Sequence, residues 1–497
     1  MRSILFSLAI VLAAAATAAE PGFSEIIIAA GFHVEQPVLA ASLSDDNARH
    51  VVLAGRDDDH QQRLAVYRVD GANEDSPQPI LSLAPGANLI AYDVGRLGNR
   101  DALFFIEPGR ILRYDFAVNR LVAVVDIRTI YGQERAGAIV PIDFFRDINQ
   151  DDRDDLVVPD TAGYRVRLQR TDGSLGDEIL LRESSSMTVS SGIVSFESRP
   201  LVSGNMNFDA LTDLAVWRGD SLRVYAQLPG ARFEGRPQVV PLGLDLLSEA
   251  EMRTLQNNRG AVDQRELTEK RIWSIEDLND DQLPDILTES TFSEGVFDKR
   301  NEFGLHLGRM DGDRLVYRET EDAQLASEGL QFGLIGTDID GDGKKDLVVR
   351  KVRLTFGRVI RALLSGNVSL QLHFFKMTAD DNYSDSADYV AKTNVRFSVT
   401  SGQVDIPAIE VADFDGDGRK DLVMQTGRNR LSFYHGVATE HLFSKDEVDM
   451  DVILPRNGAL VAAEDIDGNG NADLIIRYNA ADGNDSAHTV RLLLAIQ

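Results

Sequence analysis

Short apolar segments that follow acidic, glycine-rich turns recur along the chain. The clearest is Asp338 to Val349, DIDGDGKKDLVV, in which a polar turn leads directly into an apolar run. Runs that are rich in β-branched and apolar residues and bounded by Asp and Gly are typical of strands. The segment recurs as DFDGDGRKDLVM at Asp413 to Met424 and as DIDGNGNADLII at Asp465 to Ile476. The pattern therefore predicts a repeating all-β architecture.

Weaker copies extend the repeat over nearly the whole chain. Three of them, starting at Asp147, Asn205 and Asp277, keep an oxygen-bearing side chain at positions 1, 3, 5 and 9. Two others, starting at Ser42 and Asp93, lose most of these side chains, so we expect a hairpin without an ion there. The eight starts, at 42, 93, 147, 205, 277, 338, 413 and 465, lie 51 to 75 residues apart. This period is in the range of a four-stranded propeller blade.

These units predict an all-β, eight-bladed β-propeller of four-stranded blades, with seven blades as the alternative if the first unit is misread. In each unit we expect a second strand to begin at position 10 and the apolar side chain at position 2 to point into the blade. Only one good strand, His488 to Ala495, follows the last loop, so Glu25 to Ala30 is expected to complete this blade and close the ring. Residues 20–497 would form this single domain, with small helical insertions near Ser248 and over Arg358 to Leu364.

The spacing of the acidic residues indicates a metal site in each loop. Side chains at positions 1, 3, 5 and 9 and the carbonyl at position 7 can surround a hard cation, most simply Ca²⁺. Glycines at positions 4 and 6 permit the positive φ angles of a tight loop. An EF-hand is excluded, because position 12 is apolar and the flanks are strand-like. The remaining alternative is a turn that satisfies its own backbone, although clustered carboxylates without a cation would be electrostatically unfavourable.

Five loops form the main predicted ligand set. The loops at 338 and 413 carry four formal negative charges and both glycines, and should bind best. Asp152 and Gln282 replace the later glycine in two other loops, which we expect to strain those turns. The predicted Ca²⁺ ligands are Asp338, Asp340, Asp342, Lys344, Asp346, Asp413, Asp415, Asp417, Arg419, Asp421, Asp465, Asp467, Asn469, Asn471, Asp473, Asp147, Asn149, Asp151, Arg153, Asp155, Asp277, Asn279, Asp281, Leu283 and Asp285. A weaker set, with two carboxylates, is Asn205, Asn207, Asp209 and Asp213.

The N-terminus and the composition limit the function. Arg2, the apolar run Ile4 to Ala16 and the small residues Thr17 to Ala19 predict a signal peptide over residues 1–19, hence a periplasmic or secreted protein. An uncleaved anchor is the alternative, but the run is short for a membrane span. The chain has no cysteine, which excludes disulfides, and its formal charge is −28, from 79 acidic and 51 basic residues. This charge disfavours nucleic acid and anionic membranes as partners.

The repeated DxDxDGxxDL loops resemble the FG-GAP/VCBS repeats of the integrin α-subunit type of β-propeller. The resemblance covers nearly all of the mature chain. It implies Ca²⁺ in the loop between the first and second strands of a blade, held by positions 1, 3, 5, 7 and 9. Units one and two depart from the family pattern because they lose the ligands. The family's Phe-Gly signature is faint and is represented by Gln331-Phe332-Gly333 before one loop. The family's Gly-Ala-Pro signature is not clearly present.

No known catalytic motif stands out. The eight histidines show no HExxH and no paired spacing suited to zinc, and the chain has no GxSxG elbow or phosphate-binding glycine loop. We therefore predict a binding or scaffolding module for an unidentified protein or glycan, without catalysis and with its specificity in the longer intervals between repeats. The alternative is a lyase acting on acidic polysaccharides, which a basic, aromatic-lined cleft would favour. The adhesion tripeptide Arg218-Gly219-Asp220 is better explained as a turn.

Overall fold

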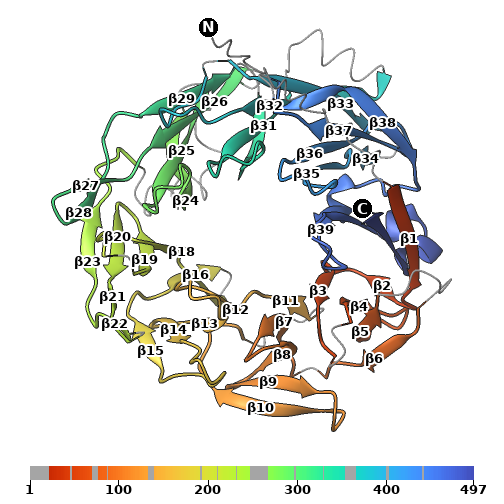
Figure 1. Cartoon of the computed structure of the whole chain (residues 1–497), viewed down its shortest axis with the longest axis horizontal. Coiled ribbons are helices and arrows are strands. Elements are labelled where there is room, and N and C mark those ends of the chain that lie inside the picture. The colour runs from red at the N-terminus through yellow and green to blue at the C-terminus, as the bar shows by residue number, and fades with distance from the viewer. Residues whose placement is uncertain are drawn as a thin grey trace, which may run out of the picture.

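Eight β-sheets lie around a common axis in the computed structural model, as the blades of a closed β-propeller (Figure 1). The predicted all-β, eight-bladed architecture is confirmed, and the seven-bladed alternative is wrong. The structure describes residues 22–44, 48–69, 77–86, 88–132, 139–190, 193–209, 211–230, 232–246, 267–295, 298–327, 330–352, 365–384, 386–398, 402–438 and 441–496. The predicted signal peptide and the helices predicted near Ser248 and over Arg358 to Leu364 lie outside these residues. No helix within them is long and apolar enough to cross a membrane.

Blades 1 to 4 follow one another along the chain. Blade 1 contains β2 (His33–Val34), β3 (Leu39–Ala41), β4 (His50–Arg56), β5 (Gln62–Arg68) and β6 (Pro79–Leu83). Blade 2 contains β7 (Ala91–Arg96), β8 (Asp101–Glu107), β9 (Arg110–Asp115), β10 (Arg120–Asp126) and β11 (Val140–Pro141), which pairs in parallel with β7. Blade 3 contains β12 (Phe145–Arg146), β13 (Asp155–Asp160), β14 (Gly163–Arg167) and β15 (Ile179–Leu181). Blade 4 contains β18 (Leu201–Gly204), β19 (Asp213–Arg218), β20 (Ser221–Tyr225) and β23 (Gln238–Pro241).

Blades 5 to 8 complete the ring. Blade 5 contains β24 (Leu267–Glu276), β25 (Asp285–Gly295), β26 (Asp298–His306) and β29 (Ala323–Ser327). Blade 6 contains β30 (Leu330–Thr337), β31 (Asp346–Val352), β32 (Asn367–Phe375), β33 (Tyr389–Phe397) and β34 (Val404–Asp405). Blade 7 contains β35 (Ile409–Ala412), β36 (Asp421–Gln425), β37 (Arg430–Gly436) and β38 (Phe443–Asp451). Blade 8 contains β39 (Val461–Glu464), β40 (Asp473–Arg477), β41 (Thr489–Ile496) and β1 (Gly22–Ala29).

Small hairpins and helical turns decorate the blades. The hairpins are β16 (Ser186–Ser190) with β17 (Ile193–Glu197), β21 (Gln227–Leu228) with β22 (Arg232–Phe233), and β27 (Arg309–Asp311) with β28 (Arg314–Val316). The helical elements are η1 (Gly458–Leu460), η2 (Ala480–Asp482) and α3 (Asn484–Ala487). The adhesion tripeptide forms the tight turn between β19 and β20, with Gly219 at φ 59°. The turn interpretation of this tripeptide is therefore confirmed.

The ring closes by pairing the two ends of the described chain. Strand β1 is the outermost strand of blade 8 and runs antiparallel to β41, from Gly22 opposite Ile496 to Ala29 opposite Thr489. Figure 1 shows this red strand beside the blue strands of the last blade. Because β1 leads directly into blade 1, blades 8 and 1 share one continuous segment of chain. Such a closure covers a sheet edge that would otherwise be exposed.

The hydrophobic core consists of layers between blades. Eight clusters of buried side chains occur among the described residues, and each joins two neighbouring blades. Ile339, at position 2 of its loop, packs with Leu422 and Phe443 of blade 7. Position 2 is therefore buried as expected, and it packs both with its own blade and with the next one.

Two expectations about strand boundaries need correction. The second strand of a unit begins at position 9 and not at position 10, because Asp346 already pairs with Thr337 across the hairpin. The sequence also predicts an insertion from Arg358 to Ala391, with a polar loop over Asp380 to Ala387. The described part of this interval contains β32 and the start of β33, which are strands of blade 6, so it is not a separate insertion. The described residues of the predicted loop lie between these two strands.

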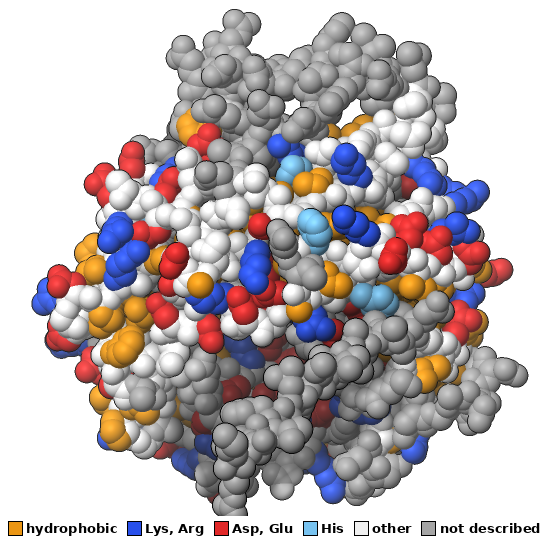
Figure 2. All heavy atoms as spheres, turned by 45° about the horizontal axis from the view of Figure 1, so that its top comes forward, with side chains coloured by type: hydrophobic (Ala, Val, Ile, Leu, Met, Phe, Trp, Pro, Cys, Tyr) orange, Lys and Arg blue, Asp and Glu red, His pale blue; other side chains and the backbone are white. Residues whose placement is uncertain are grey.

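Acidic and basic side chains are mixed over one face of the molecule. Figure 2 shows acidic and basic side chains interspersed over the face in view. The net charge of −28 is therefore not gathered into one acidic patch on that face.

Candidate functional site

The acidic loops share one backbone conformation. In the loop starting at Asp338, Gly341 and Gly343 have φ angles of 78° and 90°. Asp152 and Gln282, which replace the second glycine elsewhere, still adopt φ angles of 63° and 70°. Non-glycine residues rarely occupy this region, so these two turns carry the strain that their sequence predicts.

The carboxylate at position 1 organises the turn. Asp338 Oδ1 accepts hydrogen bonds from the backbone N–H groups of Gly341 at 2.8 Å and Asp342 at 3.2 Å, and its Oδ2 accepts one from Gly343 at 3.0 Å. Asp413 and Asp465 accept equivalent bonds in their own loops. Position 1 is therefore a turn-forming residue in addition to a possible ligand.

The carboxylate at position 9 joins three strands of its blade. Asp346 Oδ2 accepts the backbone N–H of Ile339 at 3.0 Å, and Oδ1 accepts that of Met377, just beyond β32, at 2.9 Å. All six loops repeat these two bonds. The position-9 residues are Asp155, Asp213, Asp285, Asp346, Asp421 and Asp473.

Burial makes the negative charge at position 9 costly. It raises the pKa of Asp155 and of Asp285 to about 7, and the pKa of Asp346 to about 6. Backbone hydrogen bonds lower each pKa, and neighbouring loop carboxylates raise it further. A cation beside these groups would relieve both the burial cost and the mutual repulsion.

Position 3 gives the clearest sign that the loops suit a cation. Asp340 Oδ1, Asn149 Oδ1 and Asn279 Oδ1 are buried and have no hydrogen-bond partner among the described residues. The two Asn side chains turn their NH₂ groups toward the position-5 carboxylates, Asp151 at 3.1 Å and Asp281 at 3.2 Å. Buried polar atoms are normally satisfied, so these oxygens are free to coordinate a metal ion.

Three loops bring three carboxylate oxygens within 4.8 Å of one another. The groups are Asp338, Asp340 and Asp346; Asp413, Asp415 and Asp417; and Asp465, Asp467 and Asp473. In the other three loops an Asn stands at position 3 and donates to the position-5 carboxylate in each case. The weak loop at Asn205 makes this bond from Asn207 to Asp209 at 3.0 Å.

Basic side chains contact some of these carboxylates. Lys376 pairs with Asp340, and Arg419 at position 7 pairs with Asp417. His435 Nδ1 lies 3.4 Å from Asp415 and 3.5 Å from Asp421. These contacts compete with a cation in both loops that have four carboxylates. The described ion pairs include none on the side chains of the loop at Asp465.

Position 7 contributes its N–H to the turn. The backbone N–H of each position-7 residue donates to the side chain at position 5, at 2.7 to 3.2 Å. Their side chains diverge: Arg153 and Arg419 reach back to Asp151 and Asp417, whereas Lys344 pairs with Asp381. Leu283 and Asn471 are buried. The predicted set is thus brought together loop by loop, and its role as ligands stays a prediction.

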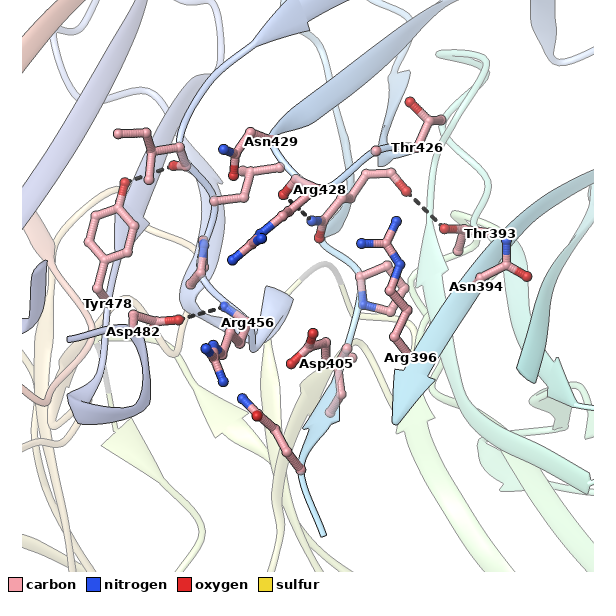
Figure 3. A pocket seen from close by; sticks show the side chains of 18 of the residues that line it. Thr393, Asn394, Arg396, Asp405, Thr426, Arg428, Asn429, Arg456, Tyr478 and Asp482 are labelled. Atoms are coloured by element: carbon pink, nitrogen blue, oxygen red, sulfur yellow. Dashed lines mark hydrogen bonds between the residues drawn. The ribbon is translucent and has the colours of Figure 1, made fainter. Parts of the chain in front are cut away.

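A polar pocket of about 540 Å³ lies at the other end of the strands, between blades 6, 7 and 8. It is lined by the turn from β36 to β37, whereas the acidic loop of blade 7 connects β35 to β36, at the opposite end of β36. Arg396, Arg428 and Arg456 are among its lining residues, and Figure 3 shows them around the pocket. None of these guanidinium groups forms an ion pair within the described part of the chain.

Other lining residues give the pocket a mixed character. Ile406 and Ile453 are 44% and 51% exposed, so apolar surface lies beside the arginines. Asp405 Oδ1 is buried without a hydrogen-bond partner among the described residues. Asp482 is already occupied, because it accepts the N–H of Arg456 at 2.8 Å. No sequence motif indicates this pocket, because its arginines come from three separate places: Arg396 lies in β33, Arg428 in the turn from β36 to β37, and Arg456 between β38 and η1.

Comparison with known proteins identifies the repeat. Residues 413–476 match the model of the FG-GAP-like repeat, which confirms the resemblance there. No curated protein matches the chain. Similar solved structures include the WD40 domain of SCAP from fission yeast, at 10% identity, 95% coverage of this chain, 98% of that chain and a TM-score of 0.37. The V. cholerae biofilm matrix protein Bap1 is similar at 10% identity, 94% and 89% coverage and a TM-score of 0.37. Likeness at this level carries no argument about function.

Proposed function

We propose that this chain, which carries an FG-GAP-like repeat at residues 413–476 on an eight-bladed propeller, is a secreted or periplasmic binding module stabilised by Ca²⁺. An FG-GAP propeller is the fold of a generic protein-binding module. The extracytoplasmic location rests on the signal-like sequence of residues 1–19. The ligand we propose is an acidic segment of a partner protein, bound in the pocket between blades 6, 7 and 8.

The arginine-lined pocket is the observation that carries the binding role. In a chain with 28 more acidic than basic residues, three arginines without an ion-pair partner among the described residues line one pocket. Guanidinium groups bind carboxylates through paired, charge-assisted hydrogen bonds. The adjacent Ile406 and Ile453 can cover an apolar residue next to the acidic one, and Asp405 can accept a backbone N–H of the same peptide.

The pocket fits an acidic sugar less well than a peptide. Tyr478 is the one aromatic residue among the described residues of the lining. It is buried and its hydroxyl donates to the carbonyl of Ile453 at 2.7 Å, so it offers no ring face for stacking. Burial raises the pKa of Tyr478 to about 12, which makes it a poor base for abstracting a proton from a uronate. The described lining residues include no His or Lys. The lyase alternative therefore receives no support from this pocket.

Ca²⁺ has a structural part in this proposal. The position-3 oxygens without partners and the position-9 carboxylates with raised pKa would be satisfied by a cation held by positions 1, 3, 5 and 9 and the position-7 carbonyl. The ion would neutralise each loop and fix the first hairpin of its blade. We expect the loops at Asp338, Asp413 and Asp465 to hold ions, because each gathers three carboxylate oxygens.

Fluorescence anisotropy with a labelled peptide of alternating Glu and Leu tests the binding role. We expect the double variant Arg428→Ala/Arg456→Ala to weaken binding by about tenfold or more, since each lost charge-assisted bond is worth about 1.5–3 kcal/mol. Arg314→Ala, an exposed arginine of blade 5, is the matched control and should bind as wild type. Equal binding of a peptide with Gln in place of Glu, or a preference for oligogalacturonate, would refute the proposed ligand.

A further inference from the structure

We propose that His33, Asp58 and His488 form a site for a transition metal ion of the Zn²⁺ type, at the joint that closes the ring. This site is separate from the acidic loops and from the arginine-lined pocket. His33 lies in β2, Asp58 lies in the turn after β4, and His488 lies between α3 and β41. Two of the residues therefore belong to blade 1 and one belongs to blade 8.

The distances between the three side chains fit the edges of a coordination polyhedron. Asp58 Oδ1 lies 3.6 Å from His33 Nε2 and 3.5 Å from His488 Nε2, and the three ligand atoms all lie within 4.8 Å of one another. Ligands about 2.0–2.1 Å from a tetrahedral Zn²⁺ are about 3.3–3.4 Å apart. Both distances are longer than an ordinary N–H···O bond of about 2.9 Å. The carboxylate thus lies beside the two imidazoles without being hydrogen-bonded to either.

The histidines present their ring nitrogens to one point. The two rings meet edge to face, with centroids 4.5 Å apart. His488 Nε2 is buried and has no hydrogen-bond partner among the described residues. His33 Nε2 lies 2.9 Å from Asn484 Oδ1, a hydrogen bond that a bound metal would replace. Asn484 would then stand beside the remaining coordination position, which water can fill.

The ligand atoms of this site favour a different ion from the one that suits the acidic loops. Two neutral imidazoles and one carboxylate are typical of Zn²⁺ and related transition metals, whereas oxygen-only loops favour Ca²⁺. Neither histidine lies in a motif, and they come from opposite ends of the sequence. Only the closure of the ring brings them together, which explains why the spacing of the histidines predicted no zinc site.

A metal ion at this site would stabilise the pairing that closes the ring between blades 8 and 1. The carbonyl of His488 already accepts the backbone N–H of Ala30 at 2.8 Å, just past the strand β1 that completes blade 8. Coordination would add bonds between blade 8 and both His33 and Asp58 of blade 1. Because the ligands come together only in the closed ring, the metal would stabilise the folded state by mass action.

Isothermal titration of the chelator-treated, dialysed full chain with ZnCl₂ tests the site, with Co²⁺ absorption as a report on the ligands. We expect one equivalent of Zn²⁺ to bind, a visible Co²⁺ band that Zn²⁺ displaces, and at least a tenfold loss of affinity in His33→Ala and in His488→Ala. His441→Ala, which alters an exposed histidine of blade 7, is the matched control and should bind as wild type.

Thermal unfolding separates this site from the Ca²⁺ loops. In the His33→Ala/His488→Ala variant the gain in Tm with Zn²⁺ should vanish, while any gain with Ca²⁺ should match that of the wild type. Absence of stoichiometric Zn²⁺ binding in the wild type, or equal Zn²⁺ affinity in the variants, overturns the proposal. Neither result bears on peptide binding, so the site and the proposed function fail independently.

Discussion

At the residue scale, the position-9 Asp has two functions that the sequence pattern does not separate. The spacing predicts a ligand, but each of these carboxylates is also buried and accepts backbone N–H groups from position 2 and from the end of the third strand. The pattern could reveal only that an oxygen is required at position 9, because the burial and the second hydrogen bond depend on the folded blade.

Substitutions at positions 5 and 9 should separate metal binding from folding. We expect Asp346→Asn to lower stability by about 1–3 kcal/mol with and without Ca²⁺, because one of its two acceptor oxygens becomes an NH₂ group facing a backbone N–H. Asp342→Asn is the control, since its exposed side chain can still accept the N–H of Lys344. Asp342→Asn should reduce only the Ca²⁺-dependent part of the free energy of unfolding. Denaturant unfolding in chelator and in Ca²⁺ measures the stability of each variant with and without the ion. Equal losses of stability for the two variants in chelator would contradict the separate roles of positions 5 and 9.

The buried carboxyl group of Asp93 predicts that the stability of the protein depends on pH. Asp93 lies in the second unit, which is expected to lack an ion. Burial raises its pKa to about 7, although it accepts the N–H groups of Phe144 and Phe145, each at 2.8 Å. A carboxyl group whose pKa is higher in the folded than in the unfolded state stabilises the folded protein when it is protonated. This contribution is complete below the unfolded-state pKa, near 3.8, and is lost as the pH rises through about 7. The stability of the wild type relative to Asp93→Asn should therefore fall between pH 4 and 7, by on the order of 3 kcal/mol. A pH-independent difference in urea unfolding would refute the raised pKa.

At the element scale, the acidic loops are joints between blades. The N–H at position 8, in Lys345 and Lys420, donates to the carbonyl at position 2 of the preceding loop at 2.8 and 2.7 Å. At the closure, Arg49 of the degenerate first loop donates to the carbonyls of Asp465 and Ile466 instead. The hairpin and its positive φ angles follow from local sequence. The contacts between loops do not, because they depend on the register of one blade against the next.

Two glycines of one loop test this joint. Gly416 and Gly418 have φ angles of 75° and 85°, so alanine strains the backbone at both. A Cβ at Gly416 would lie 2.3 Å from Asn471 Oδ1 in the loop of blade 8, whereas a Cβ at Gly418 would have no neighbour within 4 Å. Gly416→Ala should therefore be less stable than Gly418→Ala by about 1 kcal/mol, as for other overpacked sites. Equal thermal stability of the two variants would show that the acidic loops of blades 7 and 8 are not in tight contact.

At the scale of the whole molecule, the ring depends on its closure. The number of blades and the missing outer strand of the last blade could be inferred from repeat counting. The arginine-lined pocket and the His33, Asp58 and His488 cluster could not, because the residues of each come from different blades. Local periodicity describes one blade well, but a site between blades becomes visible only when the blades are placed around the ring.

A substitution in β1 measures the contribution of the closure. Ile28 is fully buried in the layer between blades 8 and 1, so Ile28→Ala should cost about 2–5 kcal/mol. Glu25→Ala on the same strand is the control, because its ion pair with Arg491 is partly exposed and worth less than about 1 kcal/mol. Similar unfolding midpoints in urea for both variants would mean that β1 does not stabilise the ring.

Stabilisation by Ca²⁺ is the central claim, and thermal unfolding of the full chain in chelator and in millimolar Ca²⁺ tests it most directly. Ions that bind only the folded loops must raise Tm by mass action, and several filled sites should raise it by about 5 °C or more. The rise should shrink when Asp342, Asp417 and Asn469 are all replaced by Ala, since each is the predicted position-5 ligand in one of the three loops that gather three carboxylate oxygens. An unchanged Tm in the wild type would contradict the account.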